Sequence, residues 1–79
     1  MIIISGSQIR AARALLGWSQ RELSKKSKVA FGTIQRMEKF DGPVGSRTET
    51  LAKVVAILEK AGIEFLNSEG PGLRLLKRK

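Results

Sequence analysis

Apolar residues recur at helical spacing in two long stretches of this chain, near its start and in its second half. The stripe that predicts a helix over residues 6–16 consists of Ile9, Ala12, Leu15 and Leu16. The stripe that predicts a helix over residues 47–61 consists of Leu51, Val54, Val55 and Leu58. Two shorter helices are expected between them, at residues 20–27 and 30–39. The pattern therefore predicts a mainly α-helical fold with four helices.

Polar residues punctuate these stretches where helices should begin and end. In a capping box, the residue just before a helix and the residue three positions later pair with each other: the side chain of each accepts a bond from the backbone N–H of the other. The pairs with this spacing are Ser5 with Gln8, Ser19 with Glu22, and Ser46 with Glu49. Gly17 and Gly62 follow the first and fourth helices, where glycine accepts the left-handed conformation that terminates a helix.

After residue 62 the spacing of apolar residues changes from helical to alternating. The segments 63–66 and 72–76 each alternate apolar and charged residues and are separated by a stretch rich in turn formers, which predicts a β-hairpin. The register that keeps the two faces distinct pairs Phe65 with Leu73, Glu64 with Arg74, and Ile63 with Leu75.

The first residues, Met1 to Ile4, are apolar and β-branched with no polar side. Such a segment is expected to pair as a short strand with the hairpin or with a second subunit. With a length of 79 residues, the chain is predicted to form one domain over residues 1–79.

Composition narrows the classes of function. The chain has no cysteine and no histidine, which excludes thiolate or imidazole zinc sites, Cys or His nucleophiles and a Ser-His-Asp triad. Its few acidic residues are assigned to helix caps or ion pairs, so we expect no enzyme, no metal and no cofactor. The first residues lack a secretory signal and no apolar run approaches a membrane span, which favours a cytoplasmic protein.

Charge points to a polyanionic partner. Fifteen Lys and Arg residues against seven acids give a net charge of +8. Such an excess favours nucleic acid or an anionic membrane surface.

The predicted third helix has one apolar and one polar side. Ala30, Ile34 and Met37 fall on the side that can pack against the protein. The opposite arc carries Phe31, Gly32, Gln35, Arg36 and Lys39. The amide, guanidinium and ammonium groups there can bond to base edges and phosphates, and an exposed phenylalanine can touch a thymine methyl. The alternative is that this arc is an ordinary solvent-exposed helix face without a binding role. The basic surroundings and the exposed aromatic ring favour a binding surface instead.

These motifs together resemble the helix-turn-helix domains of the Cro and phage-repressor type, the XRE family. The resemblance runs from residue 9 to about residue 63. It is carried by the run from Arg13 to Leu23, by Val29, by the run from Thr33 to Glu38, and by Thr50 with Leu51. It implies double-stranded DNA as the partner and the third helix as the element that enters the major groove.

The resemblance also implies roles for single residues. Base-facing positions would be Phe31, Gly32, Gln35 and Arg36. Backbone-contacting positions would be Gln20, Lys39, Ser46 and Arg47. Arg13 would form an ion pair with Glu38, so that Glu38 has a structural role and not a catalytic one.

The chain departs from the family pattern at four places. Lys28 occupies a turn position where glycine is usual, and Ala30 stands where a capping Ser or Thr is common. Gly32 removes a side chain from a base-facing position. The hairpin replaces a fifth helix, a variation that resembles small bacterial regulators.

The leading hypothesis is a sequence-specific transcriptional regulator of the bacterial nucleoid, most simply a repressor that binds as a homodimer. The alternative is a protein-interaction module, such as an antitoxin whose hairpin grips a toxin. A toxin-like reading frame beside the gene would favour the alternative.

Overall fold

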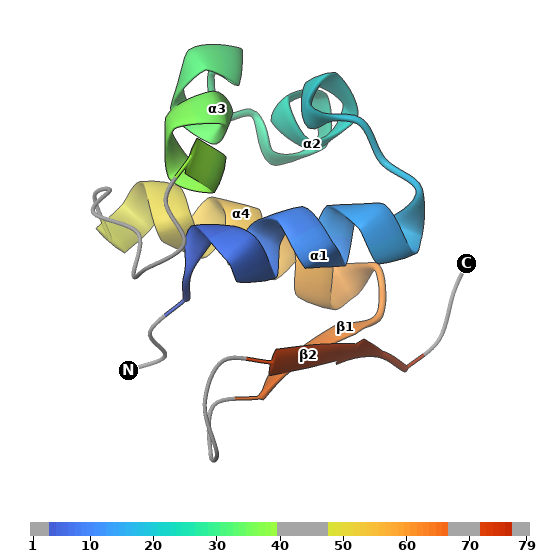
Figure 1. The fold of residues 1–79 in the computed structure, drawn as a ribbon. Helices are drawn as coiled ribbons and strands as arrows, with labels where there is room; N and C mark the ends of the chain where they lie inside the picture. The colour runs from blue at the N-terminus through green and yellow to red at the C-terminus, as the bar shows by residue number, and fades with distance from the viewer. Residues whose placement is uncertain (1–3, 40–47, 67–71, 77–79) are drawn as a thin grey trace.

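The computed structural model describes residues 4–39, 48–66 and 72–76. Its elements, in chain order, are α1 (Gly6–Leu16), α2 (Gln20–Ser27), α3 (Phe31–Lys39), α4 (Thr48–Lys60), β1 (Ile63–Leu66) and β2 (Gly72–Leu75). Figure 1 shows α1 crossing the middle of the molecule with α4 behind it, α2 and α3 on one side, and the hairpin on the other. The predicted fold, mainly helical with a C-terminal hairpin, is confirmed.

Two of the predicted capping boxes are present. The Gln8 amide N–H donates to Ser5 Oγ (3.2 Å) and the Ser5 amide N–H donates to Gln8 Oε1 (2.8 Å). Ser19 and Glu22 make the same two bonds at the start of α2, at 3.1 and 2.9 Å. The third predicted box, at Ser46, lies outside the described residues. Both boxes orient the helices that surround the core.

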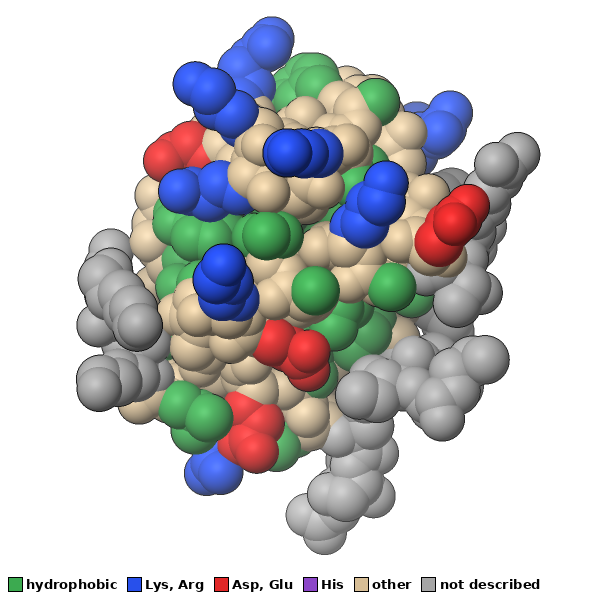
Figure 2. Space-filling model, turned by 180° about the vertical axis from the view of Figure 1, so that it is seen from behind, with side chains coloured by type: hydrophobic (Ala, Val, Ile, Leu, Met, Phe, Trp, Pro, Cys, Tyr) green, Lys and Arg blue, Asp and Glu red, His purple; other side chains and the backbone are tan. Residues whose placement is uncertain are grey.

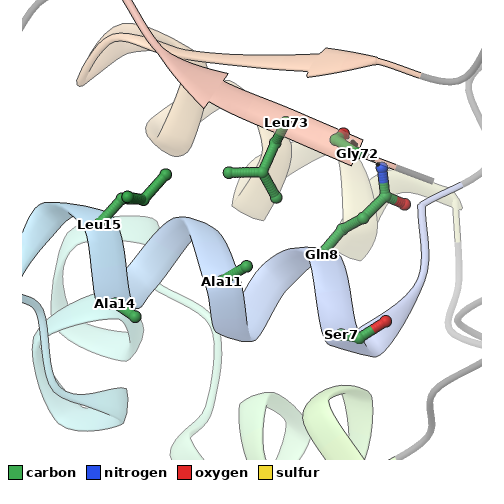
Figure 3. A pocket seen from close by; sticks show the side chains of 7 residues that line it. All are labelled: Ser7, Gln8, Ala11, Ala14, Leu15, Gly72 and Leu73. Atoms are coloured by element: carbon green, nitrogen blue, oxygen red, sulfur yellow. Dashed lines mark hydrogen bonds between the residues drawn. The ribbon is translucent and has the colours of Figure 1, made fainter.

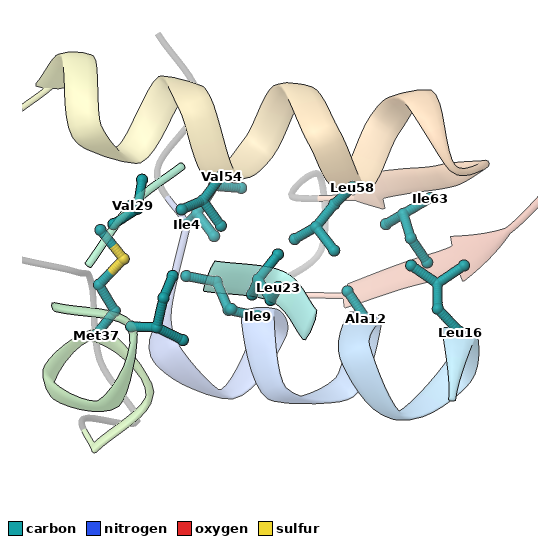
Figure 4. Packing of buried hydrophobic residues seen from close by; sticks show 11 residues of the cluster. Ile4, Ile9, Ala12, Leu16, Leu23, Val29, Met37, Val54, Leu58 and Ile63 are labelled. Atoms are coloured by element: carbon teal, nitrogen blue, oxygen red, sulfur yellow. The ribbon is translucent and has the colours of Figure 1, made fainter. Parts of the chain in front are cut away.

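The core lies between α1 and α4, with α2, α3 and the hairpin closing its sides (Figure 4). Its largest fully buried side chains are Ile4, Ile9, Leu23, Ile34, Met37, Val54 and Leu58. The prediction that Leu15 belongs to the buried stripe of the first helix is wrong, because this side chain is 45% exposed. Leu15 is rotated about 100° around the helix from Leu16, which places it at the edge of the buried stripe.

The hairpin has the predicted register, with Phe65 opposite Leu73 and Ile63 opposite Leu75. Glu64 and Arg74 form an ion pair on its exposed face. Gln8 Nε2 donates to the Gly72 carbonyl (2.9 Å), so the start of α1 is tied directly to the start of β2. The hairpin is therefore packed on α1 as well as joined to α4.

The ends of some elements differ from the prediction. α3 begins at Phe31, because Ala30 stays outside the helix while its carbonyl accepts the amide N–H groups of Thr33 and Ile34. α4 spans 48–60 against the predicted 47–61, and β2 ends at residue 75 against the predicted 76. In the part of the chain that the structure describes, no helix is long and apolar enough to cross a membrane.

The N-terminal segment enters the core of its own chain. Ile4 is only 1% exposed and packs with the buried apolar residues, and Ser5 makes an isolated β-bridge. The rest of the predicted strand, residues 1–3, lies outside the described residues. Ile4 is thus already buried within the protomer and is not an exposed contact for a second subunit.

Candidate nucleic-acid interface

The turn between α2 and α3 sets the angle between the two helices. Lys28 adopts the left-handed conformation, with φ 59° and ψ 30°, where glycine would be free of strain. Ser24 Oγ donates to the Val29 carbonyl (2.6 Å) and Val29 is buried, so the turn is held from both of its ends. The local bonds therefore hold a non-glycine residue in this backbone geometry.

The inner side of α3 is anchored through a buried carboxylate. Glu38 is 3% exposed, and its oxygens accept bonds from Arg13 Nε (2.9 Å) and Arg13 Nη2 (2.8 Å). Arg13 Nη1 also donates to the Trp18 carbonyl (2.9 Å), and Arg10 donates to the Glu38 carbonyl. The hydrogen bond to Glu38 raises the pKa of Arg13, which keeps the guanidinium charged. These bonds join α1, the turn at Trp18 and the end of α3.

Gln20 belongs to the same cluster. Its Nε2 donates to Glu38 Oε1 at 3.2 Å, which orients the side chain at the first residue of α2. Gln20 is predicted from the sequence to contact the DNA backbone, and no local signal in the sequence predicts this bond. This bond uses one of the two N–H donors of the Gln20 amide, so a phosphate contact by Gln20 would have to use the other.

The outer side of α3 is open to solvent. Gly32, Gln35, Arg36 and Lys39 are exposed, and a Cβ added at Gly32 would meet nothing within 4 Å. Arg36 makes only a long contact with Thr33 Oγ1 (3.4 Å) among the bonds of this face. These residues share one surface, so the structure brings together the predicted base-facing positions and Lys39. Ser46 and Arg47 lie outside the described residues.

The expectation that Phe31 is an exposed aromatic residue is wrong. Its ring is half-buried because the guanidinium of Arg21, from α2, stacks over it with 4.3 Å between Cζ and the ring centroid. The sequence analysis did not single out Arg21. Arg21 lies two residues after the cap of α2. Its proximity to the start of α3 depends on the angle between the two helices, which the sequence does not give.

The two helices carry a strong positive charge. In residues 20–39, all of which are described, the exposed cations are Arg21, Lys25, Lys26, Lys28, Arg36 and Lys39. Glu22 is the exposed acid of this segment, and Glu38 is buried beside Arg13. Figure 2 shows most of the Lys and Arg side chains of the rear face in the half of the molecule that contains α2 and α3. This half suits a polyanion.

A second surface feature lies on the other side of α1. An open hollow of about 630 Å³ runs between α1 and β2 (Figure 3). It is lined by uncharged residues: Ser7, Gln8, Ala11, Ala14, Leu15, Gly72 and Leu73. These positions of α1 face away from Arg13, so the hollow and the exposed side of α3 are separate surfaces.

Part of the chain is similar to a known protein family. Residues 9–40 match a family model described as helix-turn-helix, and no curated protein matches the chain. The match covers most of α1 and all of α2 and α3, the helices joined by the Arg13–Glu38 cluster. Over these residues the chain is similar to the helix-turn-helix family, in agreement with the resemblance that the motifs of the sequence indicated. The helix-turn-helix is a motif with which many proteins bind DNA.

Proposed function

We propose that the protein is a sequence-specific regulator of transcription that binds double-stranded DNA, reads the major groove with α3 and acts as a repressor on the DNA of the bacterial nucleoid. The observation that carries the proposal is the division of α3 into two sides. One side is anchored by Ile34, Met37 and the Glu38 cluster, and the other exposes donors and acceptors without being tied to the rest of the protein.

Within this proposal the residues of α3 divide by role. Gln35 and Arg36 present groups that can bond to base edges, while Phe31 and Gly32 form the part of the surface where a base can approach closely. Lys39, at the end of the helix, and Gln20 contact the phosphate backbone. Ser46 and Arg47 are assigned to the backbone on the family resemblance only.

The repressor is proposed to act as a homodimer. One short helix reads few base pairs, so two copies on half-sites about one helical turn apart give a useful selectivity. We assign the contact to the uncharged hollow between α1 and β2, with a second copy of the chain as its occupant. The chain has a net charge of +8, so two copies repel each other over most of their surfaces. The residues that line the hollow are uncharged, so two copies can meet there with little electrostatic repulsion.

A binding-site selection from random duplexes, followed by a salt titration on the selected site, tests the DNA reading. We expect a defined and symmetric site, and a logarithmic salt slope of about −4 to −6 per protomer if five or six phosphates are contacted. Arg74→Ala removes one cation from the hairpin, away from α3, and should leave the slope unchanged. A flat salt dependence, or no enrichment of any duplex, would contradict the proposal.

The assembly is tested by the mass of the protein in solution with and without DNA. Ala11→Lys places a charge in the hollow and should shift the dimer to monomer, whereas Ala56→Lys on the exposed side of α4 should not. A wild-type protein that is monomeric in both conditions would overturn the dimer. Such a result would favour the alternative, an antitoxin or similar module whose hairpin side binds another protein.

A further inference from the structure

The stacked pair Arg21 and Phe31 lies at the start of the helix that is proposed to enter the major groove. Arg21 comes from α2 and is exposed, whereas Phe31 is the first residue of α3 and is half-buried beneath it. The separation of 4.3 Å between the guanidinium carbon and the ring centroid is well within the range of a cation–π contact. The guanidinium of Arg21 thus covers one part of the Phe31 ring in the protein without DNA.

Space beside the backbone of α3 is open at Gly32. Gly32 follows Phe31, and a Cβ at Gly32 would meet nothing within 4 Å. A glycine at this point lets the edge of a base come close to the backbone of α3 and to the neighbouring aromatic ring. Phe31 itself has no donor or acceptor, so the group that it can recognise on a base edge is apolar. The apolar group that DNA presents in the major groove is the methyl at C5 of a pyrimidine.

We propose that Arg21 and Phe31 form one reading unit for a pyrimidine 5-methyl group, in which Phe31 contacts the methyl and Arg21 is a positioning residue that holds the ring. The unit rests on the proposed function, because it needs α3 in the major groove. Thymine and 5-methylcytosine both carry this methyl group. Holding the ring in place lowers the entropy lost when the base is bound, so Arg21 contributes to discrimination through the ring as well as through its charge.

A second stacked pair provides the control. Lys26 Nζ lies 5.1 Å from the Trp18 ring centroid, and both residues border a hollow with Ile57, Lys60 and Ala61 near the end of α4. Lys26→Gln therefore removes one positive charge and one contact with an aromatic ring from the same helix as Arg21, without touching the start of α3. A change in methyl discrimination that Arg21→Gln produces and Lys26→Gln does not is therefore not a general result of losing a positive charge from α2.

The experiment uses the full chain and the duplex obtained by site selection. Each thymine of the half-site is replaced by uracil, which removes only the methyl, and the cytosine and 5-methylcytosine forms of the sensitive position are compared as well. For the wild-type protein we expect about a 5-fold loss of affinity at one position on replacing thymine by uracil, and a preference of similar size for 5-methylcytosine over cytosine. The ratio of two affinities of the same protein cancels any partial loss of folding.

Phe31→Ala should bring both ratios to about 1, and Phe31→Leu should leave an intermediate value. Arg21→Gln should reduce the ratios at the same position to about 2, whereas Lys26→Gln should leave them at the wild-type value while lowering affinity for every duplex. The reading unit is overturned if no thymine of the selected site is sensitive to loss of its methyl, or if Arg21→Gln retains the wild-type ratios. If no duplex is selected at all, the proposed function itself fails, which separates the two results.

Discussion

Substitution of Arg13 by alanine is the sharpest test of how α3 is held. The change removes the two bonds that Arg13 donates to Glu38 and the one that it donates to the Trp18 carbonyl, and it leaves the carboxylate with Gln20 as its remaining side-chain donor. The carboxylate is almost fully buried, with 2% of the Glu38 side chain exposed against 21% for Arg13. Removing one partner of a buried pair costs about 3–5 kcal/mol, and partial access of water at Arg13 lowers our expectation to about 2–4 kcal/mol.

That loss is large for a chain of 79 residues, whose total stability is expected to be about 4–12 kcal/mol. The midpoint of thermal unfolding should fall by at least about 10 °C. Chemical denaturation followed by circular dichroism gives the free energy of unfolding directly.

Two further variants make the interpretation specific. Combining Arg13→Ala with Glu38→Gln should cost less than the sum of the single changes, because the double variant no longer buries an unpaired charge. Arg74→Ala breaks the ion pair with Glu64 on the hairpin, whose side chains are 62% and 40% exposed, and should cost less than about 1 kcal/mol. If Arg13→Ala were no more damaging than Arg74→Ala, the buried carboxylate would not hold α3 in place.

Three other results are expected. Lys28→Gly should raise the free energy of unfolding by about 1 kcal/mol, because glycine adopts the left-handed conformation without strain, and denaturation of the two proteins side by side measures the difference. Arg36→Ala should relax the preference for one base pair by about 1–3 kcal/mol, whereas Lys39→Ala should weaken binding to selected and random duplexes alike; equal effects on both duplexes would place Arg36 on the backbone. The free energy of unfolding should change little between about pH 6 and 9, because the chain has no histidine, cysteine or tyrosine. The raised pKa of Arg13 means that its contribution to stability is lost only at much higher pH, as the pH rises through that raised pKa. A pH series of denaturation midpoints would reveal an unexpected titrating group.

The helices and the hairpin could be predicted because their signals are local. The boxes at Ser5 and Ser19 determine helix starts through bonds that span three residues, and the alternation after Gly62 leaves one register that keeps apolar and charged faces apart. The apolar side of α3, with Ile34 and Met37, followed from spacing in the same way.

The features that could not be predicted depend on how whole helices pack. The bond from Gln20 to Glu38 and the stacking of Arg21 on Phe31 join residues of α2 and α3, and their geometry follows from the angle at Lys28. Local propensity carries no information about such contacts. The burial of Ile4 is of the same kind, because an apolar segment before a helix can cover its own core or another subunit with equal ease.

The bond between Gln8 and the Gly72 carbonyl also has a consequence for the order in which the chain folds. It joins residues 64 positions apart, whereas α1, α2 and α3 meet over much shorter separations. Closing the longer loop costs more chain entropy, so we expect the three helices to form first and the hairpin to dock on them afterwards. Gln8 completes the cap of α1 as well as this contact. Docking of the hairpin therefore stabilises the first turn of α1. We expect the amide protons at the start of α1 and in β2 to be protected from exchange together, as one cooperative unit.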